Sequence, residues 1–490
     1  MPKTNRPLTV AAILCAMFMA AMEMTVVSTA MPTVIGDLGG IQHYAWVFTA
    51  YMIATTITVP LFGKLADLYG RKPIMLFGIA LFVLGSTASG QARTIGQLIA
   101  FRAVQGLGAG SMQPTALTIA GDIFDLEERA RIQGVFGAVW GVAGLIGPVL
   151  GGLIVKWLSW RWVFYINVPF GLGSALLLIF FFRERVERKH HTLDLAGAGL
   201  LTAAVLALLF ATRRGPLALP FAALAALTLA GFLAVERRAK EPLLPLPLFR
   251  KRVMAVTTLV GALLGAGMIA TVTFVPLYIQ AVCGGTATEA GSAITPMVIG
   301  WPLASAVGGR VLPRVGFRPL IWSGLVLSAG GTIALARLLS PGMSLNVARV
   351  TTLVVGAGLG FANTPLLIAV QTSVDWKQRG VATASTMFFR TIGGTLSIGV
   401  LGSVLAARLT RDPSVPVEAA NALLGPDHGR TLAPDVLHSL SGALADGLGT
   451  VFWAVGAIAI VTFASGLLFP YVPTRASTEN GEAASQAEAA

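Results

Sequence analysis

The feature that most constrains this chain is a series of apolar runs, each about 20 residues long, that recurs along its whole length. A helix of about 20 apolar residues spans a bilayer core of about 30 Å. Charged residues make up 12% of the 490 residues, whereas a soluble protein carries about 25%. The sequence therefore predicts an all-α membrane protein, because helices satisfy their own backbone hydrogen bonds in lipid. The runs do not alternate polar with apolar residues, which argues against a transmembrane β-barrel.

These runs divide into fourteen predicted spans. If the N-terminus lies in the cytoplasm, most of the 35 lysines and arginines fall in cytoplasmic segments, as the positive-inside rule requires. An even number of spans then places both termini in the cytoplasm. The predicted spans are 8–31, 45–64, 74–91, 96–121, 131–155, 162–182, 195–212, 219–235, 253–279, 290–308, 319–338, 347–372, 380–407 and 446–471.

Two basic linkers interrupt the series and predict its division into domains. They cover residues 183–191 and 236–252, on either side of the seventh and eighth spans. A long polar outer loop is expected at 408–445, with a short amphipathic helix near 415–424. The predicted domains are a six-helix bundle at 1–185, a two-helix insert with its linkers at 186–252, a second six-helix bundle at 253–472 and a disordered cytoplasmic tail at 473–490.

Several classes of function are excluded by missing motifs or by the position of charges. The formal net charge is +13, but the basic residues lie in loops between spans, so the charge reports topology and no binding of nucleic acid is expected. The motifs GxxxxGK[ST], HExxH, CxxC and GxSxG are absent, so no ATP-driven step, metal centre or enzyme chemistry is expected. Cys15 and Cys283 are predicted near opposite membrane faces, which makes a disulfide improbable. Uphill transport would therefore draw on an ion gradient.

The stretch GKLADLYGRKPIM, residues 63–75, lies in the predicted cytoplasmic loop between the second and third spans. It resembles the signature loop of the major facilitator superfamily, whose fold consists of two six-helix bundles. The matching residues are Gly63, Asp67, Gly70, Arg71 and Lys72. The loop is expected to act as a latch, in which Asp67 caps a helix N-terminus and pairs with an arginine such as Arg71, Arg129 or Arg131. The alternative is a charged hairpin that serves only membrane topology.

A second copy of this loop, GRVLPRVGFRPL at 309–320, indicates that the chain has two related halves. It has Pro313 at the position that Asp67 occupies in the first copy. The latch is therefore expected to be asymmetric. The residues that the second copy keeps are Gly309, Arg314, Gly316 and Arg318.

Glycine-rich stretches inside the apolar runs predict close helix packing. Two of them are GLGAG at 106–110 and GAGLG at 356–360. A third, GVAGLIGPVLGG at 141–152, resembles the motif associated with antiporters of the superfamily. Its matching residues are Gly144, Gly147, Pro148, Gly151 and Gly152. Small residues let another helix approach closely and seal a leak path, and Pro148 permits a kink. The resemblance implies export rather than uptake.

Two charges inside predicted spans, Glu23 and Arg102, are the candidates for ion coupling. The stretch MEMTVVSTAMP around Glu23 resembles the helix 1 motif of the fourteen-helix drug:proton antiporters, with Glu23 in place of the usual Asp. The other matches are Thr25, Ala30 and Pro32, while Ser28 replaces the usual Asn. Arg102, in LIAFRAVQGLGAG, resembles the family's arginine in helix 4. At about 1.5 Å per residue, Glu23 lies roughly 13 Å and Arg102 roughly 10 Å below the outer surface, so the two can meet.

This pair predicts proton coupling at Glu23. Burial disfavours an ionised carboxyl group, whereas a nearby arginine favours it. Because the two effects oppose each other, Glu23 is expected to gain and lose a proton near physiological pH. One alternative is a permanently ionised structural pair with Arg102. Another is an Arg102 that snorkels to the outer membrane surface.

Further residues are candidates to line a substrate cavity, with core packing as the alternative for each. Methionine adapts to irregular apolar shapes, and aromatic side chains far from the membrane surfaces suit the wall of a ligand site. An arginine inside a span should face the protein interior. The candidates are Met19, Tyr51, Trp140, Trp301, Asn363 and Arg390.

Together these features predict a proton-coupled exporter of lipophilic, often cationic small molecules, acting as a monomer in a bacterial cytoplasmic membrane. Two bundles are expected to rock about a central cavity. The expected partners are the substrates, protons and membrane lipids, with the proton gradient as the energy source and no metal or cofactor. An exporter of a native lipid or secondary metabolite is the closest alternative. A non-transporting membrane sensor or scaffold is an alternative of another class.

Overall fold

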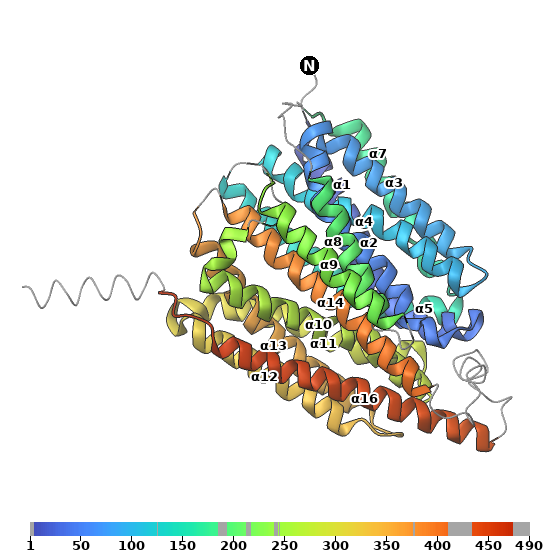
Figure 1. The fold of residues 1–490 in the computed structure, drawn as a ribbon. Coiled ribbons are helices and arrows are strands. Elements are labelled where there is room, and N and C mark those ends of the chain that lie inside the picture. The colour runs from blue at the N-terminus through green and yellow to red at the C-terminus, as the bar shows by residue number, and fades with distance from the viewer. Residues whose placement is uncertain are drawn as a thin grey trace, which may run out of the picture. The chain divides into compact units, whose positions relative to one another are not determined.

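The computed structural model describes residues 4–124, 126–184, 194–211, 217–239, 244, 246–375, 378–409 and 434–473. Within these ranges every regular element is a helix, so the predicted all-α fold is confirmed (Figure 1). Two short 3-10 turns are η1 (Ile41–His43) and η2 (Leu246–Arg250). The α-helices are α1 (Arg6–Leu38), α2 (Tyr44–Tyr69), α3 (Arg71–Gly90), α4 (Ile95–Ile123), α5 (Leu126–Trp157), α6 (Trp162–Tyr165), α7 (Asn167–Phe181), α8 (Leu195–Ala211), α9 (Ala218–Glu236), α10 (Arg252–Ala281), α11 (Ala287–Val315), α12 (Phe317–Leu338), α13 (Leu345–Thr372), α14 (Arg379–Leu409) and α16 (Pro434–Leu467).

Twelve helical segments in the described part of the chain are long and apolar enough to cross a membrane. The predicted span 162–182 is one of them and consists of α6 followed by α7. Two further helices fall short for different reasons. α8 is apolar but short, whereas α4 has 29 residues but carries Arg102 and Gln105 in its apolar stretch. With these two helices the structure is compatible with fourteen spans.

The helix that contains the last predicted span begins earlier in the sequence than that span. α16 begins at Pro434, so part of the predicted outer loop 408–445 is helical. The start of a helix outside the membrane core carries no hydropathy signal, because nothing requires its residues to be apolar. Residues 415–424, 185–191 and 474–490, where we predict an amphipathic helix, a basic linker and a disordered tail, lie outside the described residues.

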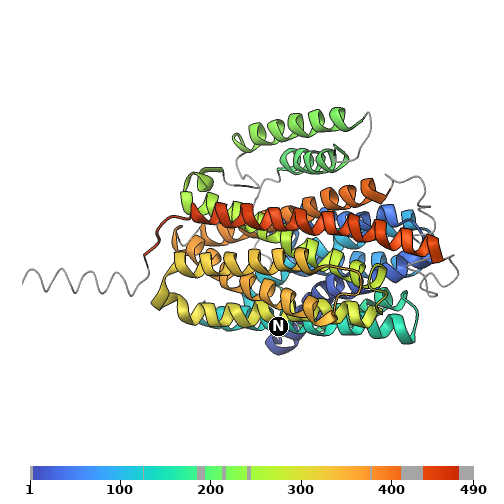
Figure 2. The ribbon, with the colours of Figure 1, turned by 90° about the horizontal axis from the view of Figure 1, so that it is seen from below.

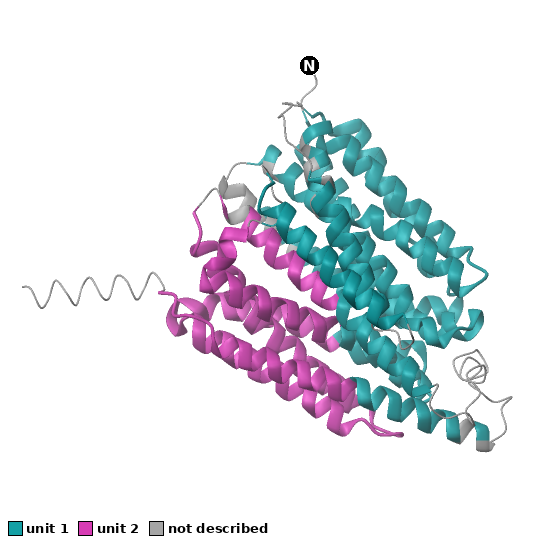
Figure 3. Ribbon diagram, in the orientation of Figure 1, with its two compact units in different colours: residues 1–244, 270–295, 395–451 teal, residues 245–269, 296–394, 452–490 magenta. Residues whose placement is uncertain are grey.

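The helices form two compact units (Figure 3). Unit 1 comprises Met1–Leu244, Ala270–Thr295 and Thr395–Val451. Unit 2 comprises Pro245–Ile269, Pro296–Gly394 and Phe452–Ala490. Unit 1 therefore contains α1 to α9 together with one end each of α10, α11, α14 and α16. The division into bundles and an insert in chain order stays a prediction.

The pair α8 and α9 forms a hairpin of two adjacent helices within unit 1 (Figure 2). Phe210 of α8 stacks on Phe221 of α9 with 5.2 Å between the ring centroids. On its other side, Phe210 lies 5.4 Å from the ring of Trp46 in α2. Leu209 fills the space beside Gly399 of α14. Apolar contacts thus connect the α8–α9 hairpin to the rest of unit 1.

Glycines bring neighbouring helices into close contact in each unit, as their clusters predict. In unit 1, a Cβ atom on Gly108 of α4 would lie 2.8 Å from the Cα atom of Phe82 in α3. In unit 2, a Cβ atom on Gly358 of α13 would lie 2.8 Å from the Cα atom of Ser328 in α12. Both distances are too short for a real Cβ atom, so these approaches require glycine. The close packing of α4 determines where its polar side chains point.

The two copies of the repeated loop turn in the same way. Each copy ends one helix and begins the next at a glycine in the left-handed region, with φ of 99° at Gly70 and 86° at Gly316. The amide of Gly70 donates to the Ala66 carbonyl at 3.0 Å, and that of Gly316 to the Leu312 carbonyl at 2.9 Å. A side chain would strain both turns. The repeat in sequence is therefore also a repeat in structure.

A basic side chain at equivalent positions of the two loops caps a helix within its own unit. Lys72 Nζ donates to the carbonyls of Ile179 and Phe182 at 2.9 and 2.8 Å, at the end of α7. Arg318 Nε donates to the carbonyl of Phe469 at 2.9 Å, just beyond the end of α16. Cations stabilise helix C-termini because the last carbonyls have no partner within the helix.

Replacing either capping residue with methionine, as Lys72→Met or Arg318→Met, is expected to lower the free energy of unfolding by about 1–2 kcal/mol. The stability is lost because the carbonyl groups at the helix end no longer accept a hydrogen bond from the side chain. Thermal unfolding in detergent would measure it, with Arg93→Met at an exposed position as the control. Equal melting temperatures for all three variants would contradict the capping role.

Candidate functional site

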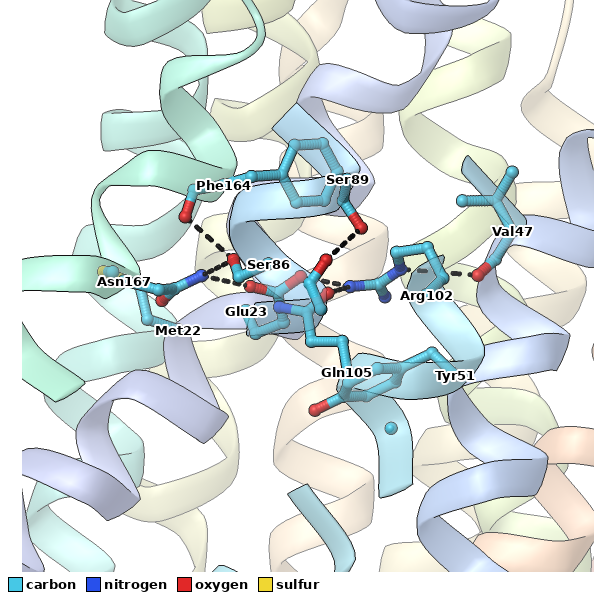
Figure 4. Close-up of polar contacts among 12 residues, drawn as sticks. Met22, Glu23, Val47, Tyr51, Ser86, Ser89, Arg102, Gln105, Phe164 and Asn167 are labelled. Atoms are coloured by element: carbon cyan, nitrogen blue, oxygen red, sulfur yellow. Dashed lines mark hydrogen bonds and ion pairs between the residues drawn. The ribbon is translucent and has the colours of Figure 1, made fainter. Parts of the chain in front are cut away.

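A buried ion pair connects α1 and α4 in unit 1 (Figure 4). Glu23 of α1 and Arg102 of α4 are each 1% exposed. Nη1 of Arg102 donates a hydrogen bond to Oε1 of Glu23. The same nitrogen donates to Oε1 of Gln105, one turn further along α4, at 2.7 Å. The structure thus brings together the two residues that the sequence nominates for proton coupling.

The rest of the Arg102 side chain is enclosed by α2. Its Nε donates to the carbonyl of Val47 at 3.5 Å, and its Cζ lies 4.2 Å from the ring centroid of Tyr51. This second contact is a cation–π interaction. A guanidinium held in this way does not reach a membrane surface, so the snorkelling alternative for Arg102 is wrong. Tyr51, a predicted cavity residue, forms a buried wall of the ion pair.

The second oxygen of the carboxylate is bonded from α7. Nδ2 of Asn167 donates to Oε2 of Glu23 at 2.7 Å and lies 3.0 Å from Oγ of Ser86 in α3. Ser86 Oγ in turn donates to the carbonyl of Phe164 in α6 at 2.8 Å. Asn167 is 1% exposed, and Ser86 is fully buried. A chain of hydrogen bonds therefore runs from Glu23 through α7 and α3 to α6 (Figure 4).

Asn167, Ser86 and Gln105 were not predicted as site residues. Asn167 had a usable signal, since it is an amide inside an apolar stretch, where a polar group needs a partner. Gln105 also had one, because it follows Arg102 by three residues and so shares its helix face. Ser86 had none, because serine is common in tightly packed membrane helices.

Three of the predicted cavity residues meet within unit 2. Nη1 of Arg390 in α14 donates to Oδ1 of Asn363 in α13 at 3.3 Å. The Cζ of Arg390 lies 5.7 Å from the ring centroid of Trp301 in α11. A Cβ atom on Gly265 of α10 would lie 2.8 Å from Cγ of Arg390, so α10 also packs closely here. Three other helices, α10, α11 and α13, thus contact this second intramembrane arginine.

The other two predicted cavity residues have different surroundings. Met19 is completely buried, and its sulfur lies 3.5 Å from where a Cβ atom on Gly171 of α7 would stand. This places Met19 in the packing between α1 and α7. Trp140 is 39% exposed on α5.

The start of α3 carries a carboxylate cap within the predicted latch. Glu184 accepts hydrogen bonds from the backbone amides of Arg71 and Lys72 at 2.5 and 2.9 Å. Arg71 also pairs through Nε with Asp122 at the end of α4, at 3.1 Å. A carboxylate at a helix N-terminus is stabilised by the unpaired amides and the helix dipole. Glu184 thus caps the N-terminus of α3, and the helix cap predicted for Asp67 stays a prediction.

Of the remaining predicted latch residues, the structure describes only some. The side chains of Asp67 and Arg131 lie outside the described residues. A Cβ atom on Gly63 would meet nothing within 4 Å, so no close approach requires glycine there. Gly70 is needed for the turn described above. The ion pair between Asp67 and an arginine stays a prediction.

The antiporter-type motif of α5 is a close-packing surface for two helices. Gly147 faces the side chain of Thr25, and a Cβ atom on Gly151 would lie 2.8 Å from the carbonyl oxygen of Val26, both on α1. A Cβ atom on Gly152 would lie 2.5 Å from Cα of Thr288 in α11. The remaining motif residues also lie in this packing: Gly144 is buried, and the carbonyl of Pro148 meets Gly291 of α11. The predicted close approach is confirmed.

Polar contacts join α10 to α1 and α2 in the same unit. Nε2 of Gln280 donates to the carbonyl of Thr29 at 3.0 Å, and Thr33 Oγ1 lies 3.3 Å from Oε1 of Gln280. The hydroxyl of Tyr44 donates to the carbonyl of Thr273 at 2.8 Å. Together with the glycine contacts, these bonds hold α10 and α11 against α1, α2 and α5.

Adding one methyl group at this packing surface, as Gly291→Ala, is expected to lower the free energy of unfolding by about 1–3 kcal/mol. The new Cβ atom would lie 2.9 Å from the carbonyl carbon of Pro148, so α5 and α11 must separate. Gly449→Ala on α16 is the matched control, because a Cβ atom there meets nothing within 4 Å. Thermal unfolding of both variants checks the expectation, and equal melting temperatures would refute it.

A sequence model of the Major Facilitator Superfamily matches residues 13–398 of this chain. Two relatives come from Bacillus subtilis (strain 168). The multidrug transporter protein MdtP is 38% identical over 425 residues, which cover 84% of this chain and 78% of the relative. The multidrug resistance protein 3 is 36% identical over 400 residues, which cover 80% and 78%.

Solved structures of transporters share the arrangement of helices. A bacterial homologue of the human lysosomal transporter Spinster, inward-facing and unoccupied, has a TM-score of 0.71 and 17% identity, covering 96% of this chain and 98% of that one. The nucleoside transporter NupG has a TM-score of 0.65 and 13% identity, covering 94% and 100%. At these identities the likeness concerns the fold alone.

Proposed function

We infer a function from one premise: this chain belongs to the Major Facilitator Superfamily, a family of membrane transporters and not of enzymes. The relative at 38% identity is named as a multidrug transporter, and the relative at 36% identity as a multidrug resistance protein. We propose that this chain exports lipophilic, often cationic small molecules in exchange for protons, by alternating access. We further propose that it acts as a monomer in a bacterial cytoplasmic membrane with both termini in the cytoplasm.

The observation that carries this proposal is the buried pair of Glu23 and Arg102. An ionisable residue inside a membrane span is costly and commonly marks the path of an ion or substrate. A carboxyl group there can exist with or without a proton, and its charge can attract a cationic substrate. Glu23 therefore offers one group for which a proton and a cation compete.

Competition at Glu23 gives a simple cycle. The ionised carboxylate accepts substrate from the cytoplasm or the inner leaflet, and protonation releases the substrate to the outside. Exchange of one monovalent cation for one proton is then electroneutral. Because Glu23 is 1% exposed in this conformation, its proton must be exchanged with water in another state of the cycle.

Reconstitution into liposomes with an imposed pH gradient tests the proposal. The purified protein is expected to move fluorescent dye cations in response to the gradient, at a rate well above that of protein-free liposomes. A membrane potential without a pH gradient is expected to drive little transport of a monovalent dye. A sensor or scaffold would move nothing in either experiment, and this result would overturn the proposal.

Export of a native metabolite is the second candidate. A relative at 30% identity is named as the MFS-type transporter of the acurin A biosynthesis cluster in Aspergillus aculeatus, and it covers 82% of this chain. Such an exporter, or an exporter of a lipid, would use the same fold and the same carboxyl group. In liposomes, it would transport a labelled lipid or metabolite and would not respond to dye cations.

A further inference from the structure

Asn167 contacts Glu23 and has an unused hydrogen-bonding atom. Its Nδ2 donates to Oε2 of Glu23, but its Oδ1 is buried and has no hydrogen-bond partner among the described residues. A buried polar atom without a partner carries a desolvation cost, so such atoms are rare in native structures. The amide orientation itself follows from charge, because an ionised carboxylate can only accept hydrogen bonds.

Protonation of Glu23 would change what the carboxyl group needs from its surroundings. A protonated carboxyl group carries an O–H donor and requires an acceptor. Arg102 cannot supply one, since a guanidinium has only donors, and Oε1 of Gln105 already accepts from Arg102. Oδ1 of Asn167 is the unused acceptor on the amide that already touches Oε2. A half-turn about the Cβ–Cγ bond of Asn167 would exchange its oxygen and nitrogen, and this torsion is broad and roughly two-fold.

We propose that Asn167 is a positioning residue that stabilises both protonation states of Glu23, donating its N–H to the carboxylate and, after a half-turn, accepting the O–H of the acid. This inference rests on the proposed coupling role of Glu23. The proton comes from water and returns to water, forming and breaking one bond at Oε2. Asn167 itself neither gains nor loses a proton.

The other groups around Glu23 fit this assignment. Arg102 of α4 and, beyond it, Tyr51 of α2 are the ionisable side chains beside the carboxyl group. The side chain that α3 contributes, Ser86, does not titrate. α5 meets this part of α1 with Ala143 and Gly147, which are not ionisable. Asn167 is therefore the group that adapts, while Arg102 keeps its charge.

The rotation has a consequence for α3 and α6. After a half-turn, Oδ1 of Asn167 would lie where Nδ2 now stands, 3.0 Å from Oγ of Ser86. Two acceptors at this distance repel, so the Ser86 hydroxyl would turn its hydrogen to Asn167 and away from the carbonyl of Phe164. Protonation of Glu23 in α1 would thus break the 2.8 Å hydrogen bond from Ser86 in α3 to the Phe164 carbonyl in α6.

Infrared difference spectroscopy between high and low pH tests the proposal on the whole protein in liposomes. The carbonyl stretch of protonated Glu23 is identified as the band that Glu23→Gln removes. In Asn167→Leu this band is expected to shift to higher wavenumber, because the acid O–H has lost its acceptor. Dye efflux driven by a pH gradient is expected to fall by roughly tenfold or more, the size of a lost hydrogen bond to a charged group.

Ser174→Ala is the matched control. Ser174 is also a fully buried α7 residue, and it donates to the carbonyl of Ala12 in α1 at 2.8 Å, away from Glu23. Its removal is expected to leave the band in place. If Asn167→Leu does not fold, Asn167→Ala removes the same amide without adding bulk, and the same shift is expected.

The possible results separate the role of Asn167 from the proposed coupling role of Glu23. A band that stays in place in the Asn167 variants overturns the inference and leaves the proposed coupling intact. A band that shifts equally in Ser174→Ala also overturns it, because the effect would then come from helix packing. The absence of any band that depends on Glu23 would overturn the proposed function and this inference together.

Discussion

Replacing Arg102 with methionine while Glu23 stays in place is expected to lower the free energy of unfolding by roughly 3–5 kcal/mol. The carboxylate is 1% exposed and would lose its charge partner, and the remaining bond from Asn167 does not offset a buried charge. The measurement is thermal unfolding in detergent, together with the amount of folded protein recovered. This is the largest stability effect that we expect from any single substitution in the chain.

The double variant Glu23→Gln, Arg102→Met is the control for this loss. It removes both charges, so it is expected to recover most of the lost stability, as replacement of a whole buried ion pair is often close to neutral. If the double variant is as unstable as Arg102→Met alone, the pair does not behave as a coupled charge pair. If it also retains full transport driven by a pH gradient, Glu23 and Arg102 form a structural pair only.

Glu23→Gln alone is expected to abolish transport driven by a pH gradient, which is the largest functional effect in the chain. Glutamine keeps the size of the side chain, and its oxygen can still accept from Arg102, but it cannot gain and lose a proton. Efflux in liposomes with an imposed pH gradient is expected to fall to the rate of protein-free liposomes. Exchange of labelled for unlabelled cationic substrate is expected to fall as well, because neutral glutamine resembles the protonated state that releases the substrate.

Glu23→Asp is the matched variant for this experiment. It keeps a titratable carboxyl group but shortens the side chain by one methylene, so partial transport driven by a pH gradient is expected. Melting temperatures of both variants distinguish a loss of transport from a loss of folded protein. Full pH-driven efflux by Glu23→Gln would show that the proton binds elsewhere.

The charged residues of the site were predicted from the sequence, whereas its neutral hydrogen-bonding residues were not. Glu23 and Arg102 stand out because a charge inside an apolar run must have a partner or a water-filled path. Asn167 and Ser86 are neutral, and such residues are tolerated in spans at low cost. Their contact with Glu23 depends on how each helix is rotated about its axis.

The loop at residues 63–75 also has a contact that its sequence could not predict. In the structure the chain turns at Gly70, and a carboxylate caps the helix that follows. That carboxylate belongs to Glu184, which is distant from the loop in sequence, and α7 brings it to the start of α3. A motif read along the chain identifies the residues of one loop but not the partners that packing supplies from other helices.

The cluster of Arg390, Asn363 and Trp301 in unit 2 was predicted in part. Its residues were candidates, but their contacts with one another were not predicted. Arg390 was a candidate because it is a charge within a span, Trp301 because it is an aromatic residue far from the membrane surfaces, and Asn363 on residue type alone. Their meeting follows from the close packing of α11, α13 and α14, with Gly265 of α10 leaving room for Arg390. No periodicity in one helix could indicate which residue of another helix it would face.

The sequence by itself determined that the chain spans a lipid bilayer and that its fold is all-α. It also determined that a carboxyl group and an arginine lie inside the membrane. It could do so because hydrophobicity and charge are properties of single residues and of their spacing along one helix. Only the tertiary structure decided that Asn167 completes the site, that Glu184 caps α3 and that α5 closes against α1 and α11. These contacts depend on glycine-to-backbone approaches and on helix rotation, which are properties of pairs of helices that meet only after folding.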